Sequence, residues 1–443
     1  MGGASRWRCR VVAVAAGVVL GAATLVGCGS SPAVGVVLDF STGAVGVDQY
    51  RVAAAECSRA SGGRYTIEPR RPTSRNTDDQ RLHLARRLAA HDPSLDIMEL
   101  DGVWTGEFAQ AGWILPYPAE LARQVEQGTF RVALETGTYQ GKLYAAPLSA
   151  STQLLWYRKD LVPNPPKTWD DMIQAAENLA AKGLPHYIEV QGAQYEGLTV
   201  WFNTLLTSSG GSIVSENSDV QVARGNAARQ ALGVMTRLAT SQAADPSLSV
   251  SQENDGRLAM EAGKAAFQVN YPFVYAMMYA PGGGGTFIDE LGRPTRQDTG
   301  RRVRDVFGWA PYPSVVAGEP ATVTTGSASL GVSTTSRHPA EAFEAVQCLR
   351  NRDNQLRNAD VGRPPTLVAL YDDPVLQERF PAWQAIRDSL TSASVRPKTP
   401  AYKNISIVIS DLLNPPAEIN PDTVVGQLAD QIAKAVTSQG LVP

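Results

Sequence analysis

Alternation between short strand-like runs and helix-like stretches constrains the fold of this chain more than any other feature of its sequence. Three runs predict strands, at residues 35–40 (GVVLDF), 64–68 (RYTIE) and 95–100 (LDIMEL). Stretches with helical periodicity separate or follow these runs, at residues 48–60, 78–90 and 104–111. Strands and helices that alternate at this spacing indicate βαβ units, so we predict an α/β fold with a mostly parallel sheet.

Later segments predict that the chain passes between two lobes. Residues 142–158 form two extended runs around a polar break, and residues 306–313 form another extended stretch. Together with a crossing near residue 363, these segments make each lobe discontinuous in sequence. The predicted N-terminal lobe consists of residues 35–148 and 310–362, and the predicted C-terminal lobe of residues 149–309 and 363–443.

The second half of the chain is expected to be mostly helical. Thr168 is a predicted N-cap, because its hydroxyl can accept a hydrogen bond from the first turn of the helix that follows. Further helices are predicted at 194–208, 223–240, 252–262, 340–350, 374–394, 404–413 and 421–438, and strands at 265–270 and 323–332. Residues 281–302 are rich in glycine and charge and predict a surface loop. A phosphate-binding loop is disfavoured there because no Lys-Ser/Thr pair or helix start follows.

The N-terminus carries the pattern of an export signal. Arg6, Arg8 and Arg10 precede an apolar stretch at residues 11–26, which is shorter than the roughly 20 residues that span a bilayer. The ending Leu-Val-Gly-Cys resembles the lipobox of bacterial lipoproteins, in which the cysteine receives a diacylglycerol. We therefore predict a signal peptide at 1–27, lipid attachment at Cys28, and a tether at 28–34. An ordinary secretory signal with a stray cysteine is the alternative.

Cysteine usage agrees with export. Cys9 would leave with the signal peptide and Cys28 would carry lipid, which leaves Cys57 and Cys348. Disulfides persist in the oxidising compartments outside the cytoplasm, so we predict a bond between these two residues. Two buried free thiols are the alternative.

Composition and motifs exclude several functions. A net charge of −3 argues against a nucleic-acid partner, which would require a basic surface. The four histidines show neither His-x-x-x-His nor His-Glu-x-x-His spacing, and no Gly-x-Ser-x-Gly motif is present. We therefore predict a binding protein without a metal or cofactor. Two alternatives remain, an exported glycoside hydrolase that uses two carboxylates and a lipoprotein adaptor that binds protein or lipid.

Several stretches together resemble a known family, the carbohydrate-binding proteins that feed ABC importers and include maltose-binding protein. The matching elements are residues 143–147, residues 202–203 with 210–211, and residues 260–267 (MEAGKAAF). The ordered set QRLHLARRLA, LDIMELDGVW, KLYAAPL, TQLLWYR, VWFNTLL, AEAFEAVQCLR and ASVRPKTPAY is most similar to trehalose-binding lipoproteins of that family. The resemblance implies a periplasmic-binding-protein fold whose two lobes close about a hinge cleft. It also implies a monomer on the outer face of the cytoplasmic membrane that delivers sugar to a permease, with Cys57 and Cys348 in the same lobe.

A saccharide site requires polar groups for hydroxyls and aromatic rings for the apolar sugar faces. By resemblance, the positions that contact the ligand are Asp101, Glu196, Tyr271, Phe273, Gly326, Arg396 and Ser151. Thr42 is added because, like Asp101, it sits at the end of a predicted strand, and ligands of such sheets bind beyond the carboxyl ends of the strands. Trp104 is a further candidate. For several of these residues a structural role is the alternative: Asp101 as a cap, Tyr271 and Phe273 as core, Arg396 as a solvated arginine and Trp104 as packing.

The chain departs from the trehalose-binding pattern at several of these positions. Ser151 replaces an expected Asn and Tyr271 an expected Trp, while Val45 and Gly46 replace a Thr-Asp pair. Gly326 is followed by Ser327 instead of a second glycine. Several hydrogen bonds to trehalose would therefore be absent or replaced, and a site built to bond a hydroxyl discriminates strongly when a partner is missing. The sequence accordingly predicts either trehalose or a related disaccharide as the ligand.

Overall fold

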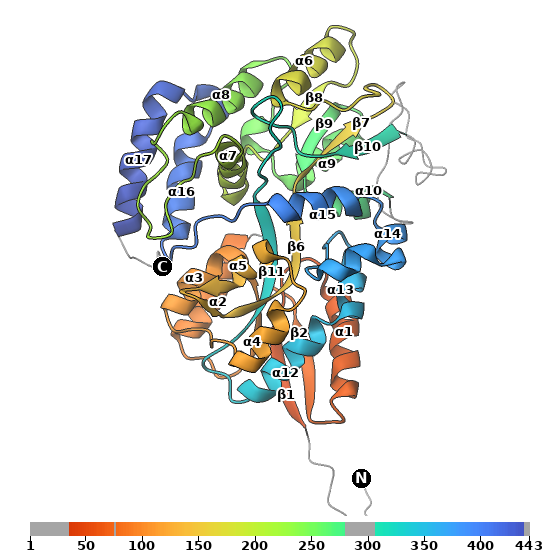
Figure 1. The fold of residues 1–443 in the computed structure, drawn as a ribbon, viewed down its shortest axis with the longest axis vertical. Coiled ribbons are helices and arrows are strands. Elements are labelled where there is room, and N and C mark those ends of the chain that lie inside the picture. The colour runs from red at the N-terminus through yellow and green to blue at the C-terminus, as the bar shows by residue number, and fades with distance from the viewer. Residues whose placement is uncertain (1–34, 75–76, 280–305, 438–443) are drawn as a thin grey trace, which may run out of the picture. The chain divides into compact units, whose positions relative to one another are not determined.

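A computed structural model describes residues 35–74, 77–279 and 306–437 (Figure 1). The predicted signal peptide, the lipid attachment at Cys28, the tether and the glycine-rich segment 281–302 lie outside the described residues. Within the described part of the chain, no helix combines the length and the apolar character needed to cross a membrane.

The first sheet has five strands in the order β2-β1-β3-β11-β6. Their bounds are β1 Val36–Ser41, β2 Tyr65–Arg70, β3 Ile97–Asp101, β6 Ala145–Thr152 and β11 Thr325–Val332. Strand β1 pairs in parallel with β2 and β3, whereas β11 runs antiparallel to both β3 and β6. The predicted mostly parallel sheet is therefore confirmed, with β11 as the strand that runs the other way.

Both faces of the first sheet are covered. Successive strand residues point to opposite faces, so Ile97 packs in one apolar cluster and Met98 in another. The helices and turns that belong with this sheet are α1 Val47–Ala60, α2 Thr77–Ala89, η1 Gly102–Trp104, α3 Thr105–Gln110, α4 Ala119–Glu126, α5 Arg131–Gly137, α12 Pro339–Leu349 and α13 Arg352–Ala359, with a hairpin of β4 Thr138–Tyr139 and β5 Lys142–Leu143. Burial on both faces explains why the strands read as apolar runs in the sequence.

The second sheet has four strands in the order β10-β7-β9-β8. Their bounds are β7 Leu154–Arg158, β8 Tyr187–Glu189, β9 Ala265–Asn270 and β10 Phe307–Ala310. Strand β7 runs antiparallel to β10 and β9, and β8 pairs in parallel with β9. Helices α6 Trp169–Ala180, α7 Glu196–Ser208, α8 Ala227–Thr240, α9 Glu253–Glu261, α16 Tyr402–Leu413 and α17 Pro421–Thr437 accompany it. Figure 1 shows α7, α8, α16 and α17 packed as neighbours, and α7 buries residues on almost every side.

The remaining described elements are short. They are α10 Phe273–Tyr279, η2 Leu248–Val250, η3 Val368–Asp372, α14 Pro374–Arg379, α15 Trp383–Ser392 and η4 Pro416–Glu418. The helix predicted at 374–394 is therefore two helices. They are separated at Pro381, because a proline lacks the N–H that a helix interior needs. The predicted cap at Thr168 is confirmed, because its Oγ1 accepts a hydrogen bond from the Asp171 N–H at 3.0 Å.

The chain changes sheets at points that differ from the predicted lobe bounds. Strand β6 stays in the first sheet to Thr152, where it pairs with Thr325, and β7 begins the second sheet after a single residue, Gln153. On the return, Tyr312 and Val323 still pack with the core of the second sheet. The exchanges thus occur at residue 153 and just before Thr325, later than residues 149 and 310, because β6 runs unbroken to Thr152 and because Tyr312 and Val323 still pack in the core of the second sheet. The other predicted bounds stay predictions.

The predicted disulfide is confirmed. Cys57 on α1 and Cys348 on α12 are bonded, with an S–S distance of 2.01 Å and Cα atoms 5.8 Å apart. Both cysteines belong to the apolar cluster on one face of the first sheet. The bond therefore ties two helices of that sheet that are separated by 291 residues in sequence.

Candidate ligand-binding site

Arg396 joins a carboxylate at the end of a strand of the first sheet to a carboxylate on a helix that accompanies the second sheet. Its Nη2 donates to Oδ1 of Asp101 at 2.8 Å, and its Nη1 donates to Oε1 of Glu196 at 2.7 Å. Asp101 is the last residue of β3, and Glu196 is the first residue of α7. The Arg396 side chain is only 5% exposed, so the alternative of a solvated surface arginine is wrong.

The two carboxylates differ in how much hydrogen-bonding capacity they keep. Oε1 of Glu196 accepts from Arg396 and from the hydroxyl of Tyr402, and its Oε2 accepts from the hydroxyl of Ser406. Asp101 accepts from Arg396 and from the Val103 N–H through Oδ1 alone, and within the described residues no hydrogen bond reaches its Oδ2. Asp101 is thus both a cap for η1 and the carboxylate with a free oxygen.

A cavity of about 280 Å³ lies beside Asp101. Four of the predicted site residues line it: Asp101, Ser151, Gly326 and Trp104. Their strands bring them together, because Ser151 on β6 is the register partner of Gly326 on β11, and β11 also pairs with β3. The cavity therefore opens along the carboxyl end of β3, as predicted for a sheet of this kind.

Tyr271 lies against the glycine of this group. A Cβ atom added at Gly326 would be 3.2 Å from Cε1 of Tyr271, so only glycine lets the ring approach the strand without displacement. Burial raises the pKa of the Tyr271 hydroxyl, although the charge of Arg396 opposes the rise, and the hydroxyl remains protonated. Tyr271 can consequently offer a ring face and a hydrogen-bond donor at this edge of the cavity.

Five of the nine predicted residues are not among those that line the cavity, whereas Trp104 lines it but is mostly packed: the five are Glu196, Tyr271, Arg396, Phe273 and Thr42. Phe273 begins α10 and packs against an apolar cluster. Thr42 is buried and donates through Oγ1 to the carbonyl oxygen of Arg70 at 3.1 Å. Trp104 is 6% exposed and stacks on Phe108 with ring centroids 6.2 Å apart, so packing accounts for most of its surface.

The structure adds residues that the sequence analysis did not predict. Tyr402 and Ser406, both on α16, hold Glu196 in place, and Lys403 of the same helix pairs with Asp78 of α2 at 2.6 Å. Their signal in the sequence is weak, because Tyr402 lies before the predicted helix at 404–413, and only the observed α16 places it on one face with Ser406, four residues further on. Glu99 and Arg363 also line the 280 Å³ cavity. Glu99 precedes Asp101 by two residues, a spacing that places both on one face of a strand.

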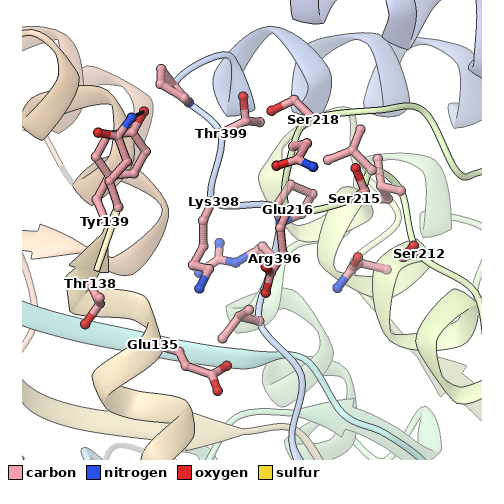
Figure 2. A pocket seen from close by; sticks show the side chains of 18 of the residues that line it. Glu135, Thr138, Tyr139, Ser212, Ser215, Glu216, Ser218, Arg396, Lys398 and Thr399 are labelled. Atoms are coloured by element: carbon pink, nitrogen blue, oxygen red, sulfur yellow. Dashed lines mark hydrogen bonds between the residues drawn. The ribbon is translucent and has the colours of Figure 1, made fainter. Parts of the chain in front are cut away.

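A second, larger hollow of about 780 Å³ also borders Arg396 (Figure 2). Three segments line it, residues 131–141, residues 203–218 and residues 395–400. Figure 2 shows the segment with Arg396, Lys398 and Thr399 running between Glu135–Tyr139 and Ser212–Ser218. Arg396 thus borders this hollow while its guanidinium is bonded to Asp101, which lines the smaller cavity.

The cavity is lined by charged and neutral polar groups. It combines a carboxylate oxygen, serine hydroxyls, an arginine network and an aromatic ring. Among the described residues, no group of three or more His, Cys, Asp or Glu side chains is arranged to hold a metal ion. The arrangement is suited to binding a neutral polyhydroxylated ligand through charge-assisted hydrogen bonds.

Comparisons with known proteins agree with a binding role. A family model described as "Bacterial extracellular solute-binding protein" matches residues 76–356. A "Probable ABC transporter-binding protein" of Deinococcus radiodurans is 28% identical over 337 residues, which cover 72% of this chain and 74% of that protein. Two solved structures share the fold. Maltose-bound MalE3 of T. maritima has a TM-score of 0.75 and 24% identity, and the match covers 90% of this chain and 99% of that one. The GacH receptor of Streptomyces glaucescens has a TM-score of 0.72 and 20% identity, with 91% and 99% covered.

Proposed function

This chain belongs to the bacterial extracellular solute-binding proteins, and we propose that it captures a disaccharide and delivers it to the permease of an ABC importer. The family consists of binding proteins, which agrees with the expectation that the chain binds its ligand without turning it over. The predicted α/β fold with two sheets, the fold of the solved relatives, agrees with this role.

One observation carries the proposal. Asp101 keeps a carboxylate oxygen without a hydrogen bond from the described residues at the edge of an open cavity lined by polar groups, while Arg396 and Glu196 hold that carboxylate in position. A hydroxyl is the simplest group that such an oxygen can accept from, and Tyr271 beside Gly326 supplies a ring face for the apolar side of a sugar.

The finer identity of the ligand is also part of the proposal. The related proteins include one described as bound to maltose and one described in complex with acarbose. The sequence resembles the trehalose-binding lipoprotein LpqY along the mature chain, with the departures at Ser151, Tyr271, Val45 and Gly46. We propose trehalose or a related disaccharide, bound by a monomer that Cys28 anchors to the outer face of the cytoplasmic membrane.

A disaccharide panel tests the proposal. The soluble chain from residue 35 onward is mixed with α- and β-linked disaccharides, and binding is followed by thermal shift and titration calorimetry. A binding protein gives a defined Kd and leaves the sugar intact. Release of monosaccharide would instead establish the hydrolase alternative, and a chain that is stabilised by no saccharide would contradict the proposal.

Asp101→Ala tests the site itself, and Asp373→Ala is its matched control. Asp373 also caps a helix, accepting from the Val375 N–H, and pairs with an arginine, Arg352, but it lies outside the cavity. Both variants lose a cap and an ion pair, but Asp101→Ala is expected to lose more stability, because Arg396 is 5% exposed and Arg352 is 55% exposed. Only Asp101→Ala is expected to lose ligand binding, by about 100-fold or more, since charge-assisted hydrogen bonds are the strong ones. Equal affinity in the two variants would show that Asp101 is not a ligand contact.

A further inference from the structure

The 280 Å³ cavity has a second charged group, the Glu99–Arg363 pair. Nη2 of Arg363 donates to Oε1 of Glu99 at 2.6 Å, and each side chain is 9% exposed. Oε2 of Glu99 accepts from the Gly43 N–H at 2.9 Å, and Nη1 of Arg363 donates to the Val45 carbonyl at 2.7 Å. The pair therefore fixes the loop after β1 against β3.

The loop at this end of the cavity offers little polar side-chain chemistry of its own. Gly43, Ala44 and Val45 line the cavity together with Glu99 and Arg363. Two glycines leave the space that the pair occupies: a Cβ atom at Gly43 would be 2.7 Å from Oε1 of Glu99, and one at Gly46 would be 3.4 Å from Nη1 of Arg363. Gly46 also has φ of +82°, which a larger residue rarely adopts. Glu99 and Arg363 are the charged groups at this end of the cavity, and Ser149 beside Arg363 also lines it.

The pair keeps hydrogen-bonding capacity for a ligand. A carboxylate offers about four acceptor positions, of which Glu99 uses two, for the Gly43 N–H and for Arg363. A guanidinium has five N–H donors, and Arg363 makes four hydrogen bonds with them, to Ser149, Val45 and Glu99. Glu99 and Asp101 lie on one face of β3, about 6.6 Å apart along the strand at about 3.3 Å per residue. The cavity thus presents two carboxylates along one wall, with Arg363 beside the first and Arg396 beside the second.

We propose that the Glu99–Arg363 pair is a specificity-determining part of the saccharide site and binds a vicinal pair of hydroxyls on one sugar ring. One hydroxyl donates to Glu99, and its neighbour accepts from Arg363. This inference rests on the proposed saccharide function. The pair would select among sugar stereoisomers, because two adjacent hydroxyls can bond the fixed Glu99 acceptor and the fixed Arg363 donor together only when the hydroxyls have the matching configuration.

A cycle of protein variants and deoxy sugars tests this assignment. Arg363→Lys keeps the charge but loses the planar fork, and Glu99→Gln keeps the shape but loses the charge. Kd is measured for the disaccharide and for its single-position deoxy analogues with the wild-type protein and with each variant. At two adjacent ring positions, deoxygenation is expected to weaken binding to the wild-type protein by about 10- to 100-fold. The same change is expected to weaken binding to the variants by less than about threefold.

Arg350→Lys is the control for a purely structural effect. Arg350 is 5% exposed and bonds the Pro147 carbonyl and the Thr129 hydroxyl, but it does not line the cavity. This variant is expected to keep the wild-type deoxygenation penalties even if its stability falls. Unchanged penalties at every ring position in both Arg363→Lys and Glu99→Gln would overturn the inference. A wild-type protein that binds no saccharide would instead overturn the proposed function. If one variant fails to fold, the other alone decides the outcome.

Discussion

Glu189 is a buried acid whose protonation should control stability at neutral pH. It ends β8, is 2% exposed, and lies beside Gln268 in the register of the second sheet. Its Oε1 has no hydrogen-bond partner among the described residues. Burial, followed by the nearby charge of Asp245, raises the pKa of Glu189 from 4.5 to about 8. The folded protein therefore holds a neutral carboxyl where the unfolded chain holds a carboxylate.

The sign and size of the effect follow from this pKa difference. Between pH 4.5 and about 8 the folded state binds more protons than the unfolded state, so the free energy of unfolding falls as pH rises. At about 1.4 kcal/mol per pH unit, the interval corresponds to about 5 kcal/mol at most. The contribution is constant below pH 4.5 and is fully lost above the folded pKa.

Urea unfolding of the wild-type protein and of Glu189→Gln at pH 5, 6, 7 and 8 measures this effect. The variant keeps the shape and a neutral polar group, so it should lack the slope. Between pH 5 and 8, the wild-type protein is expected to lose about 4 kcal/mol relative to the variant. Glu120→Gln, at a side chain that is 66% exposed, is the control and should keep the wild-type slope. Parallel curves for Glu189→Gln and the wild-type protein would refute the reasoning.

Two further changes give direct outcomes. Gly326→Ala places a methyl group 3.2 Å from Cε1 of Tyr271 and is expected to weaken sugar binding about tenfold, while the melting temperature changes little. Calorimetry and a thermal melt of the same sample measure both quantities. An unchanged affinity would show that Tyr271 is not part of the site. Cys28→Ser is expected to move the full-length protein from the membrane fraction to the soluble fraction of the expressing bacterium, because lipid anchoring requires the modified cysteine. An immunoblot of the two fractions measures this. A variant that stays in the membrane fraction would contradict lipidation at Cys28.

The sequence predicted the longer strands and the long helices because their periodicity matches their burial, but it did not predict the short strands β4 and β8. Strands β1 and β3 are covered on both faces and appear as apolar runs, and α6 begins at a residue that the cap at Thr168 identifies. Helices α4, α5, α10 and α13 were not predicted. Each has eight residues or fewer, so the sequence offers about two turns of periodicity, which tertiary packing then completes.

The candidate site was predictable one residue at a time but not as a network. Asp101 and Arg396 are separated by 295 residues, and no local pattern in the sequence predicts the hydrogen bond between them. Thr42 shows the limit of the strand-end argument. It follows β1 directly, as the argument requires, but its hydroxyl is used by the Arg70 carbonyl oxygen. A strand end places a residue near a site, whereas the direction of its side chain depends on contacts that only the folded chain supplies.

The unequal use of the two carboxylates indicates how a saccharide would gain affinity. Arg396, Tyr402 and Ser406 already occupy three of the about four acceptor positions of Glu196, so a sugar that bonded Glu196 would compete with these donors. Asp101 offers Oδ2 without that loss. Because Arg396 links both acids, Glu196 contributes by fixing the guanidinium that fixes Asp101. The entropy cost of fixing the Asp101 side chain is therefore paid when the protein folds and not when the ligand binds. This preorganisation favours a rigid ligand whose hydroxyls match the position of Asp101.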